Sequence, residues 1–256
     1  MTSDRPAAEV VVHEDASTLA GDVASRLLSR LEEEQARGEV PQIGLTGGTI
    51  ADAIHIEVAR RAPDSSVDWS KVVFWWGDER FVPSTSEDRN ARQARTALLD
   101  QLLRADPPLD PANVHEVPAA DEVEAVEDAA AAYSTALRTH GGDSLSVLML
   151  GVGPDGHIAS LFPRHPALDT SDGIAVAVHD SPKPPPLRVS LTFDALARAT
   201  SVWFLVSGAE KAAAVAAAVM EPEIAGGDRR EIPARGVLGT SETLWLLDAA
   251  AASELS

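Results

Sequence analysis

Cysteine is absent from the 256-residue chain, and its absence excludes disulfide bonds and metal sites that use thiolate ligands. No run of about 18 apolar residues occurs, so no membrane-spanning helix and no membrane partner is expected. The N-terminal sequence MTSDRPAAEV lacks the apolar segment that a secretory signal requires. Together these absences predict a cytoplasmic protein.

Positive charge is scarce as well. The chain has 21 Lys and Arg residues against 40 Asp and Glu, which gives a formal net charge of -19. A surface this acidic repels the phosphates of nucleic acids and of anionic lipids, so neither is expected as a partner. An anionic small molecule would need a local pocket of Arg, Lys and backbone N–H groups that overcomes the overall field. Aromatic residues make up only 4%, so the core is expected to consist mainly of Ala, Val, Leu and Ile.

Common motifs of metal and cofactor chemistry are also missing. The 7 histidines include no HExxH motif and no pair four residues apart, so no metal site is predicted. The chain has no Gly-x-Ser-x-Gly elbow of a serine hydrolase, and neither a P-loop nor a GxGxxG turn for a nucleotide. No cofactor is therefore expected.

What the chain does contain is an alternation of short apolar runs with amphipathic segments, which predicts strands that alternate with helices. The predicted strands are Glu9–His13, Val40–Thr46, Lys71–Trp76, Leu145–Leu150, Ser201–Val206 and Thr243–Leu247. The predicted helices run from a cap at Asp15 or Ser17 to Gly38, and over Thr49–Arg60, Asp88–Leu103, Asp121–His140 and Ala209–Met220. Because several strands are apolar throughout, we expect an α/β fold with three layers, a mainly parallel Rossmann-like sheet with helices on both faces, in one domain over residues 1–256.

Polar sequences follow four of the predicted strands, at the sheet edge where such folds bind ligands. The first is LTGGTIAD, where Gly47 and Gly48 let the backbone approach a ligand closely. The next helix begins there, so its free N–H groups and dipole favour an anion, and Thr46 and Thr49 add hydroxyl groups. Phosphate binding is one interpretation, and a plain turn before a helix is the other.

The second stretch, FWWGDERFVP, places a dense charged triplet directly after a predicted buried strand. In one interpretation Asp78, Glu79 and Arg80 pair with one another in a solvated loop. In the other, the guanidinium of Arg80 binds a phosphate, for which its planar fork is suited. Asp78 would then orient Arg80 or a hydroxyl of the substrate.

The third stretch, VLMLGVGPDGHIASLFP, joins a predicted buried strand to a glycine-rich turn. Gly151, Gly153 and Gly156 permit a tight turn with positive φ and leave room for a ligand. Asp155 and His157 are expected on one rim of that turn. Because an imidazole with a pKa of about 6.5 suits a general base, we predict this role for His157, although a lone histidine is more often structural.

Two further cations complete the set. Arg188 lies in PPPLRVSLTF, where a predicted strand and helix begin, and Lys211 lies in LVSGAEKAAAV, in the first turn of a predicted helix. A lysine at that place opposes the helix dipole, which indicates a role other than helix stability. A solvated surface lysine is the alternative.

Taken together, the stretches LTGGTI, WWGDERFVP, LGVGPDGHIASLFP, KPPPLRVSLTF and VSGAEK resemble the 6-phosphogluconolactonase family, in the family's order over Leu45–Lys211. The wider superfamily includes glucosamine-6-phosphate deaminases, whose third stretch is similar to NGHIAFNEP, with a catalytic glutamate before the proline. Phe162 stands at that place here, so the resemblance favours the lactonase branch. Thr46 stands where the family usually has serine, Ile50 where proline is frequent and Arg164 where glycine is common.

The resemblance implies an enzyme that hydrolyses 6-phospho-D-glucono-1,5-lactone to 6-phosphogluconate in the oxidative pentose phosphate pathway. His157 would take a proton from the attacking water, and Asp155 would hold the imidazole or a sugar hydroxyl. The residues expected to bind this phosphosugar lactone are Gly47, Gly48, Thr49, Asp78, Arg80, Arg188 and Lys211. The resemblance further implies a monomer without metal or organic cofactor.

Two other functions stay open. One is an isomerase or deaminase of an amino-sugar phosphate, against which Phe162 argues. The other is an inert sugar-phosphate sensor, a class that usually carries a DNA-binding domain for which this acidic chain leaves no spare length. The segments Ser181–Leu187 and Thr85–Asn90 are the candidates for loops that close over a substrate.

Overall fold

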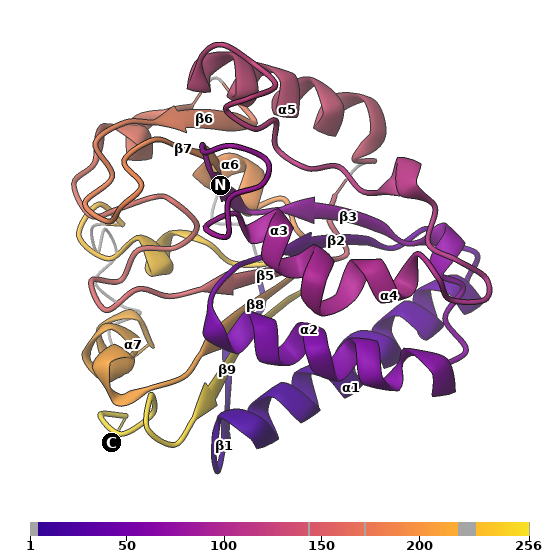
Figure 1. Cartoon of the computed structure of the whole chain (residues 1–256). Helices are drawn as coiled ribbons and strands as arrows, with labels where there is room; N and C mark the ends of the chain where they lie inside the picture. Colours follow the sequence, from indigo (N-terminus) through magenta and orange to yellow (C-terminus); the bar gives the residue numbers. More distant parts are fainter. Residues whose placement is uncertain (1–4, 143, 172, 220–228, 256) are drawn as a thin grey trace.

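The computed structural model describes residues 5–142, 144–171, 173–219 and 229–255 (Figure 1). Within these residues, six strands form a parallel sheet in the order β1-β9-β8-β5-β2-β3. Their bounds are β1 Glu9–His13, β2 Gln42–Leu45, β3 Val73–Trp76, β5 Val147–Gly151, β8 Ser201–Val206 and β9 Glu242–Asp248. A smaller antiparallel sheet contains, in spatial order, β4 Asp78–Arg80, β7 Arg188–Leu191 and β6 Ala175–Val178.

Helices cover both faces of the parallel sheet. They are α1 Ala16–Ala36, α2 Thr49–Arg61, α3 Asn90–Ala94, α4 Asp100–Leu102, α5 Val126–His140, α6 Phe193–Leu196 and α7 Ala212–Val219. A π-helical turn, η3 Arg95–Leu99, joins α3 to α4, and a 3₁₀ turn, η6 Ala209–Lys211, leads into α7. Figure 1 shows α1, α2 and α4 on one side of the parallel sheet, and α5 with β6 and β7 on the other.

Successive side chains of a strand point to opposite faces of the parallel sheet, and both faces are covered by a hydrophobic core. On β5, Val147 and Met149 pack into the core beneath α1, α2 and α4, whereas Leu148 and Leu150 pack into the core beneath α5, α6 and the small sheet. All four side chains are almost completely buried. A parallel strand covered on both faces has no polar side, so the predicted three-layer, mainly parallel α/β fold is confirmed.

Several predicted bounds agree closely with the structure. The strands Glu9–His13 and Ser201–Val206 have the predicted limits. At the start of α1, the side chain of Asp15 accepts a hydrogen bond from the Thr18 N–H at 2.7 Å, so Asp15 rather than Ser17 is the cap. The predicted helix over Asp88–Leu103 corresponds to the run from α3 through η3 to α4.

Other bounds are corrected by the structure. The helix predicted over Asp121–His140 begins only at Val126, because Ala125 is extended and its N–H donates to Asp128 at 3.1 Å as in an N-terminal cap. The Asp121 carboxylate instead accepts hydrogen bonds from Ser84. The last predicted helix begins as the 3₁₀ turn η6, and its predicted end, Met220, lies outside the described residues.

The strand predicted to begin at Arg188 is β7, but sequence reasoning missed the small sheet to which it belongs. Its strand β4 is the charged triplet, which pairs with β7 so that Asp78 faces Ser190 and Arg80 faces Arg188. Asp78 and Glu79 are 6% and 1% exposed, so the interpretation of a solvated loop is wrong. Helical or apolar periodicity cannot reveal such a strand, because its polar side chains are buried by distant partners.

In the described part of the chain, no helix is long and apolar enough to cross a membrane. The single domain and the monomeric state stay predictions.

Candidate active site

The four polar stretches follow β2, β3, β5 and β8, which are neighbours in the order β8-β5-β2-β3. Because these strands are parallel, their carboxyl ends meet at one edge of the sheet. The chain passes from β2 outward to β3, but from β5 outward to β8 in the opposite direction. Ligands of open α/β sheets bind at such a reversal, which here lies between β2 and β5.

The turn after β2 needs its two glycines for different reasons. A Cβ atom on Gly47 would lie 1.9 Å from the side-chain Oδ1 of Asn90, so no larger residue fits there. Gly48 has φ +103°, a conformation that favours glycine, and directly precedes Thr49 at the start of α2. The hydroxyl of Thr46 accepts a hydrogen bond from the Gly151 N–H at 3.4 Å, which joins this turn to β5. The N-terminus of α2 therefore lies at the reversal point between β2 and β5.

Arg80 and Arg188 lie directly opposite each other on β4 and β7. Like charges in such cross-strand positions repel, and an anion between them would offset the repulsion. Arg80 Nη1 donates to the carbonyl of Asp88 at 2.6 Å, but its buried Nε has no hydrogen-bond partner among the described residues. A buried donor without a partner is costly, so this nitrogen is suited to receive a ligand.

Arg188 is 4% exposed and donates to three consecutive carbonyl groups of the Pro-rich segment. Its Nη2 donates to Lys183 at 2.9 Å and to Pro184 at 3.1 Å, and its Nε donates to Pro185 at 3.2 Å. Burial, and after it the charge of Arg80, lowers the pKa of Arg188, while Asp78 opposes the shift. The structure thus makes Arg188 an anchor of segment Ser181–Leu187, and its contact with a substrate stays a prediction.

Asp155 and His157 lie together on the turn, as expected, and of the two partners considered for Asp155 the structure shows the imidazole. The imidazole Nδ1 lies 2.5 Å from Asp155 Oδ1, and the His157 side chain is 14% exposed. Burial alone would raise the pKa of Asp155, but the hydrogen bond and the charge of His157 outweigh it and lower this pKa to about 2. The ionised carboxylate only accepts hydrogen bonds, so in the neutral form of the imidazole it selects the tautomer with the proton on Nδ1 and the lone pair on Nε2.

Glycines make room for this pair. A Cβ atom on Gly153 would lie 1.9 Å from the imidazole Nδ1 and 2.5 Å from Asp155 Oδ1. Gly156 has φ +80°, whereas Gly151 ends β5 and Gly153 is not in the left-handed region. Of the three glycines expected to permit a turn with positive φ, Gly156 adopts this conformation and Gly151 and Gly153 do not.

Phe162 lies under the imidazole, with ring centroids 4.6 Å apart and an angle of 37° between the planes. The guanidinium of Arg188 lies 5.6 Å from the ring centroid, and the His165 ring meets the Phe162 ring edge on at 6.4 Å. Phe162 is 1% exposed, so its ring supports the histidine from the protein interior. No ionisable group occupies this place.

Lys183 is a cation near the site that sequence reasoning passed over. Burial lowers the pKa of Lys183, Asp155 opposes this shift, and the charges of Lys211 and Arg188 add to it. Lys183 therefore lies within electrostatic reach of Asp155, Lys211 and Arg188. Lys211 is the last residue of η6, which begins directly after Gly208 at the carboxyl end of β8. Gly208 has φ +105°. A signal was present, since Lys183 is a basic residue inside the Pro-rich segment of an acidic chain.

Glu79 has a structural task. Its carboxylate accepts hydrogen bonds from the backbone N–H groups of Arg80, Asn90 and Ala91 at 2.7–2.8 Å, and so caps α3. Burial raises its pKa to about 7, although Arg89 and these hydrogen bonds act in the opposite direction. Within the described residues, no group of three or more His, Asp or Glu side chains is arranged to hold a metal ion.

Arg164 has φ +59°, which explains why glycine is common at this position in the family that the sequence resembles. Its guanidinium forms an exposed ion pair with Glu231 at 2.5 Å.

Several known proteins have a related sequence and the same fold. The sequence profile of the family described as glucosamine-6-phosphate isomerases/6-phosphogluconolactonase matches residues 14–245. A 6-phosphogluconolactonase of Streptomyces coelicolor is 43% identical over 262 residues, which cover 99% of this chain and 96% of the relative. The crystal structure of 6-phosphogluconolactonase from Thermotoga maritima has a TM-score of 0.78 at 26% identity, covering 94% and 99% of the two chains. A monomeric glucosamine-6-phosphate deaminase has the same TM-score of 0.78 at 16% identity, covering 96% and 99%, so it shares the fold.

Proposed function

The chain belongs to the glucosamine-6-phosphate isomerase/6-phosphogluconolactonase family, and we propose that it hydrolyses 6-phospho-D-glucono-1,5-lactone to 6-phosphogluconate in the oxidative pentose phosphate pathway. The observation that carries this proposal is the contact of 2.5 Å between His157 and Asp155 at the reversal point of the sheet. A histidine with Nε2 free and Nδ1 held by a carboxylate is suited to general base catalysis.

In the proposed reaction, Nε2 of His157 takes a proton from water while the water oxygen attacks the lactone carbonyl carbon. The carbonyl oxygen becomes an oxyanion, for which a backbone N–H donor contributes about 3 kcal/mol. The intermediate then collapses, the bond from the carbonyl carbon to the ring oxygen breaks, and His157 returns the proton to that oxygen. Asp155 stabilises the imidazolium that exists between the two transfers. The products are a carboxylic acid and an alcohol, so no redox step or cofactor is needed.

The phosphate of the substrate would bind at the turn of Gly47 and Gly48 with Thr49, where α2 begins. Arg80 supports this assignment because its buried Nε has no partner among the described residues. Lys211 contributes positive charge from the edge after β8, and Lys183 adds to it. These cations are the local pocket that an acidic protein needs for an anionic substrate.

The deaminase alternative lacks support at Phe162. The ring packs between His157 and Arg188 and supplies no acid or base there. Fold similarity does not separate the two activities, because both classes share it.

The test generates the lactone in place with glucose-6-phosphate dehydrogenase and follows 6-phosphogluconate above the spontaneous rate. Wild type should accelerate the reaction, and His157→Ala should lose about 10²–10⁴-fold in kcat with a smaller change in KM. His140→Ala is the matched control, because His140 ends α5 away from this edge and should keep full activity. No acceleration by wild type would contradict the proposal, and ammonia release from glucosamine-6-phosphate would then be measured.

A further inference from the structure

The turn that carries His157 contains a strained residue. Ala159 has φ +49°, in the left-handed region that residues with a side chain seldom adopt. Such a conformation costs free energy and persists only where the surroundings hold it in place. Since Ala159 follows His157 by two residues, whatever holds this turn also holds the imidazole.

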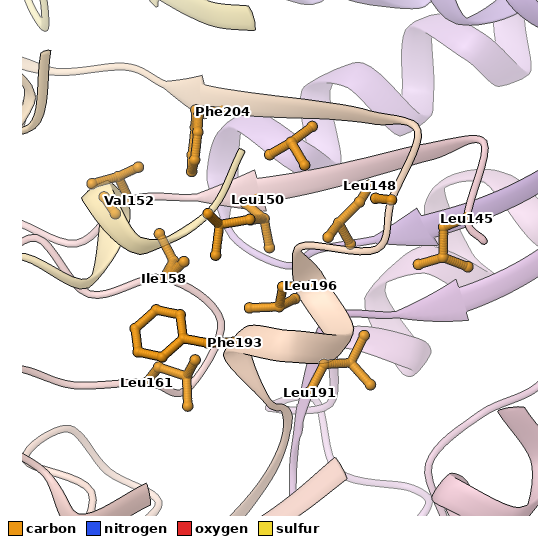
Figure 2. Close-up of a cluster of buried hydrophobic side chains, with 14 of the residues drawn as sticks. Leu145, Leu148, Leu150, Val152, Ile158, Leu161, Leu191, Phe193, Leu196 and Phe204 are labelled. Atoms are coloured by element: carbon orange, nitrogen blue, oxygen red, sulfur yellow. The ribbon is translucent and has the colours of Figure 1, made fainter. Parts of the chain in front are cut away.

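One set of contacts that holds the turn is apolar. Ile158 and Leu161 are both 0% exposed. They lie in the cluster of Figure 2 with Phe193 of α6, Leu150 of β5 and Val152. The N–H of Leu161 also donates to the carbonyl of Ile158 at 2.9 Å, which closes the turn. These contacts fix the turn against the face of the parallel sheet that α6 covers.

The other set is polar and centres on Ser160, which is 0% exposed. Its hydroxyl donates to Asp78 Oδ2 at 2.5 Å, and its N–H donates to the hydroxyl of Ser190 at 3.2 Å. Asp78 lies on β4 and Ser190 on β7, directly opposite each other. Ser160 therefore joins the turn of His157 to two strands of the small sheet.

Asp78 extends this connection to the turn after β2. The side-chain Nδ2 of Asn90 donates to the carbonyl of Asp78 at 2.9 Å and lies 3.5 Å from Asp78 Oδ1. Asn90 is 2% exposed, and its Oδ1 occupies the space that a Cβ on Gly47 would need. A continuous buried chain thus runs from Ser160 through Asp78 and Asn90 to Gly47.

We propose that Ser160 is a positioning residue of this site. Ser160 holds the strained turn of His157 in place and, through Asp78 and Asn90, fixes the position of this turn relative to the turn of Gly47 and Gly48. The inference rests on the proposed function for what the two turns do. It also changes the task of Asp78, which acts through Ser160 and Asn90 instead of on Arg80 or a substrate hydroxyl. Placement errors of about 1 Å are enough to lower a rate strongly, so the hydroxyl matters for turnover.

The experiment compares Ser160→Ala with Ser134→Ala. Ser134 is also buried, at 4% exposure, and its hydroxyl accepts one hydrogen bond, from the Ala175 N–H at 3.0 Å, on α5 away from the site. Ser160→Ala should lower kcat about tenfold or more with KM within about twofold, whereas Ser134→Ala should lower Tm and leave kcat unchanged. If both variants lose only Tm, Ser160 has a merely structural role and the proposal is wrong.

Asp78→Ala tests the connection. If Asp78 acts through Ser160, the double variant Ser160→Ala/Asp78→Ala should have a kcat within about twofold of the Asp78→Ala single variant. If Asp78 contacts the substrate independently, the two losses will multiply, and the assignment of Asp78 fails.

Hydrogen exchange gives a readout that needs no turnover. Ser160→Ala should increase exchange of the amides over 157–161 and leave those of β9 unchanged. Should Ser160→Ala fail to fold, Asp78→Asn replaces it, because it weakens the acceptor of the Ser160 hydroxyl and should increase the same exchange to a smaller degree. Unchanged exchange over 157–161 would overturn this inference even in an active lactonase. Increased exchange in a protein without lactonase activity would contradict the proposed function alone.

Discussion

The turn after β5 has an exposed carboxylate, Asp155, and the small sheet has a buried one, Glu79, and the pKa values of the two shift in opposite directions. In the turn, Asp155 keeps part of its exposure and gains His157, and its pKa falls to about 2. In the small sheet, Glu79 is 1% exposed, and burial raises its pKa to about 7. The comparison teaches that the turn keeps a carboxylate ionised beside the imidazole, whereas the small sheet uses a buried carboxyl group to hold the backbone of α3 in place.

Arg80 and Arg188 differ in a similar way, one available to a ligand and the other bound to the scaffold. Arg80, at the rim, has a buried Nε without a partner among the described residues, while Arg188, in the centre of the small sheet, donates to three carbonyl groups. Facing each other across β4 and β7, they supply one side chain for a ligand and one for the scaffold.

The largest effect is expected in the turn. Asp155→Asn keeps the size of the side chain but removes the charge that stabilises the imidazolium and that selects the Nδ1–H tautomer of the neutral imidazole. We expect kcat to fall by about 10²–10⁴-fold while Tm changes little, as measured in the coupled lactone assay and by thermal unfolding. Retention of more than about half of the wild-type rate would mean that Asp155 is not part of the base.

The second largest effect is expected for Glu79, in the dependence of the free energy of unfolding on pH. Its folded pKa of about 7 lies above the ordinary value of 4.5, so the folded state binds this proton more tightly than the unfolded state does. Its contribution is complete below pH 4.5 and is lost as the pH rises through about 7, by up to about 3 kcal/mol. Denaturant unfolding of wild type and Glu79→Gln across this window should show the loss in wild type alone. The variant should be less stable overall, since an amide nitrogen cannot accept the N–H bonds that cap α3.

The third effect tests whether Arg188 serves the scaffold. Arg188→Lys keeps the charge opposite Arg80 but loses the planar fork that binds the carbonyl groups of Lys183, Pro184 and Pro185. We expect KM to rise about tenfold with little change in kcat, because the segment that carries Lys183 loosens. The exposed Arg198→Lys is the control, with unchanged kinetics. In a Lys183→Ala background the same change should add little, and a further tenfold rise would instead indicate direct substrate contact by Arg188.

The smallest effect is expected at Arg164, at the end of the His157 turn. Arg164→Gly removes the cost of φ +59° but also an exposed ion pair and some rigidity of the unfolded chain, so stability should rise by less than about 1 kcal/mol. Arg164→Ala keeps the strained φ and loses the contacts of the guanidinium, the ion pair with Glu231 among them, so chemical denaturation of both variants separates the cost of the φ angle from the contribution of the side chain. A loss of stability in Arg164→Gly larger than in Arg164→Ala would contradict a relief of strain.

The parallel sheet and its glycine-rich turns were readable because their signals are local. Apolar runs marked β3, β5 and β8, and the pairs Gly47–Gly48 and Asp155–His157 lie close in sequence. The small sheet was not readable, because β4 looks like a polar loop until β7, more than 100 residues later, pairs with it. The roles of Lys183 and Ser160 depended on the same distant pairing.

The sequence by itself determined roughly where the strands of the parallel sheet end, which turns need glycine and that an imidazole and a carboxylate share one turn. Only the tertiary structure decided which partner each buried charge takes: Asp78 the hydroxyl of Ser160, Arg188 the carbonyl groups of the Pro-rich segment, Glu79 the first N–H groups of α3. The physical reason is that apolar periodicity and backbone conformation are set by neighbouring residues. The partner of a charged side chain is set by whatever the folded chain brings within hydrogen-bonding distance.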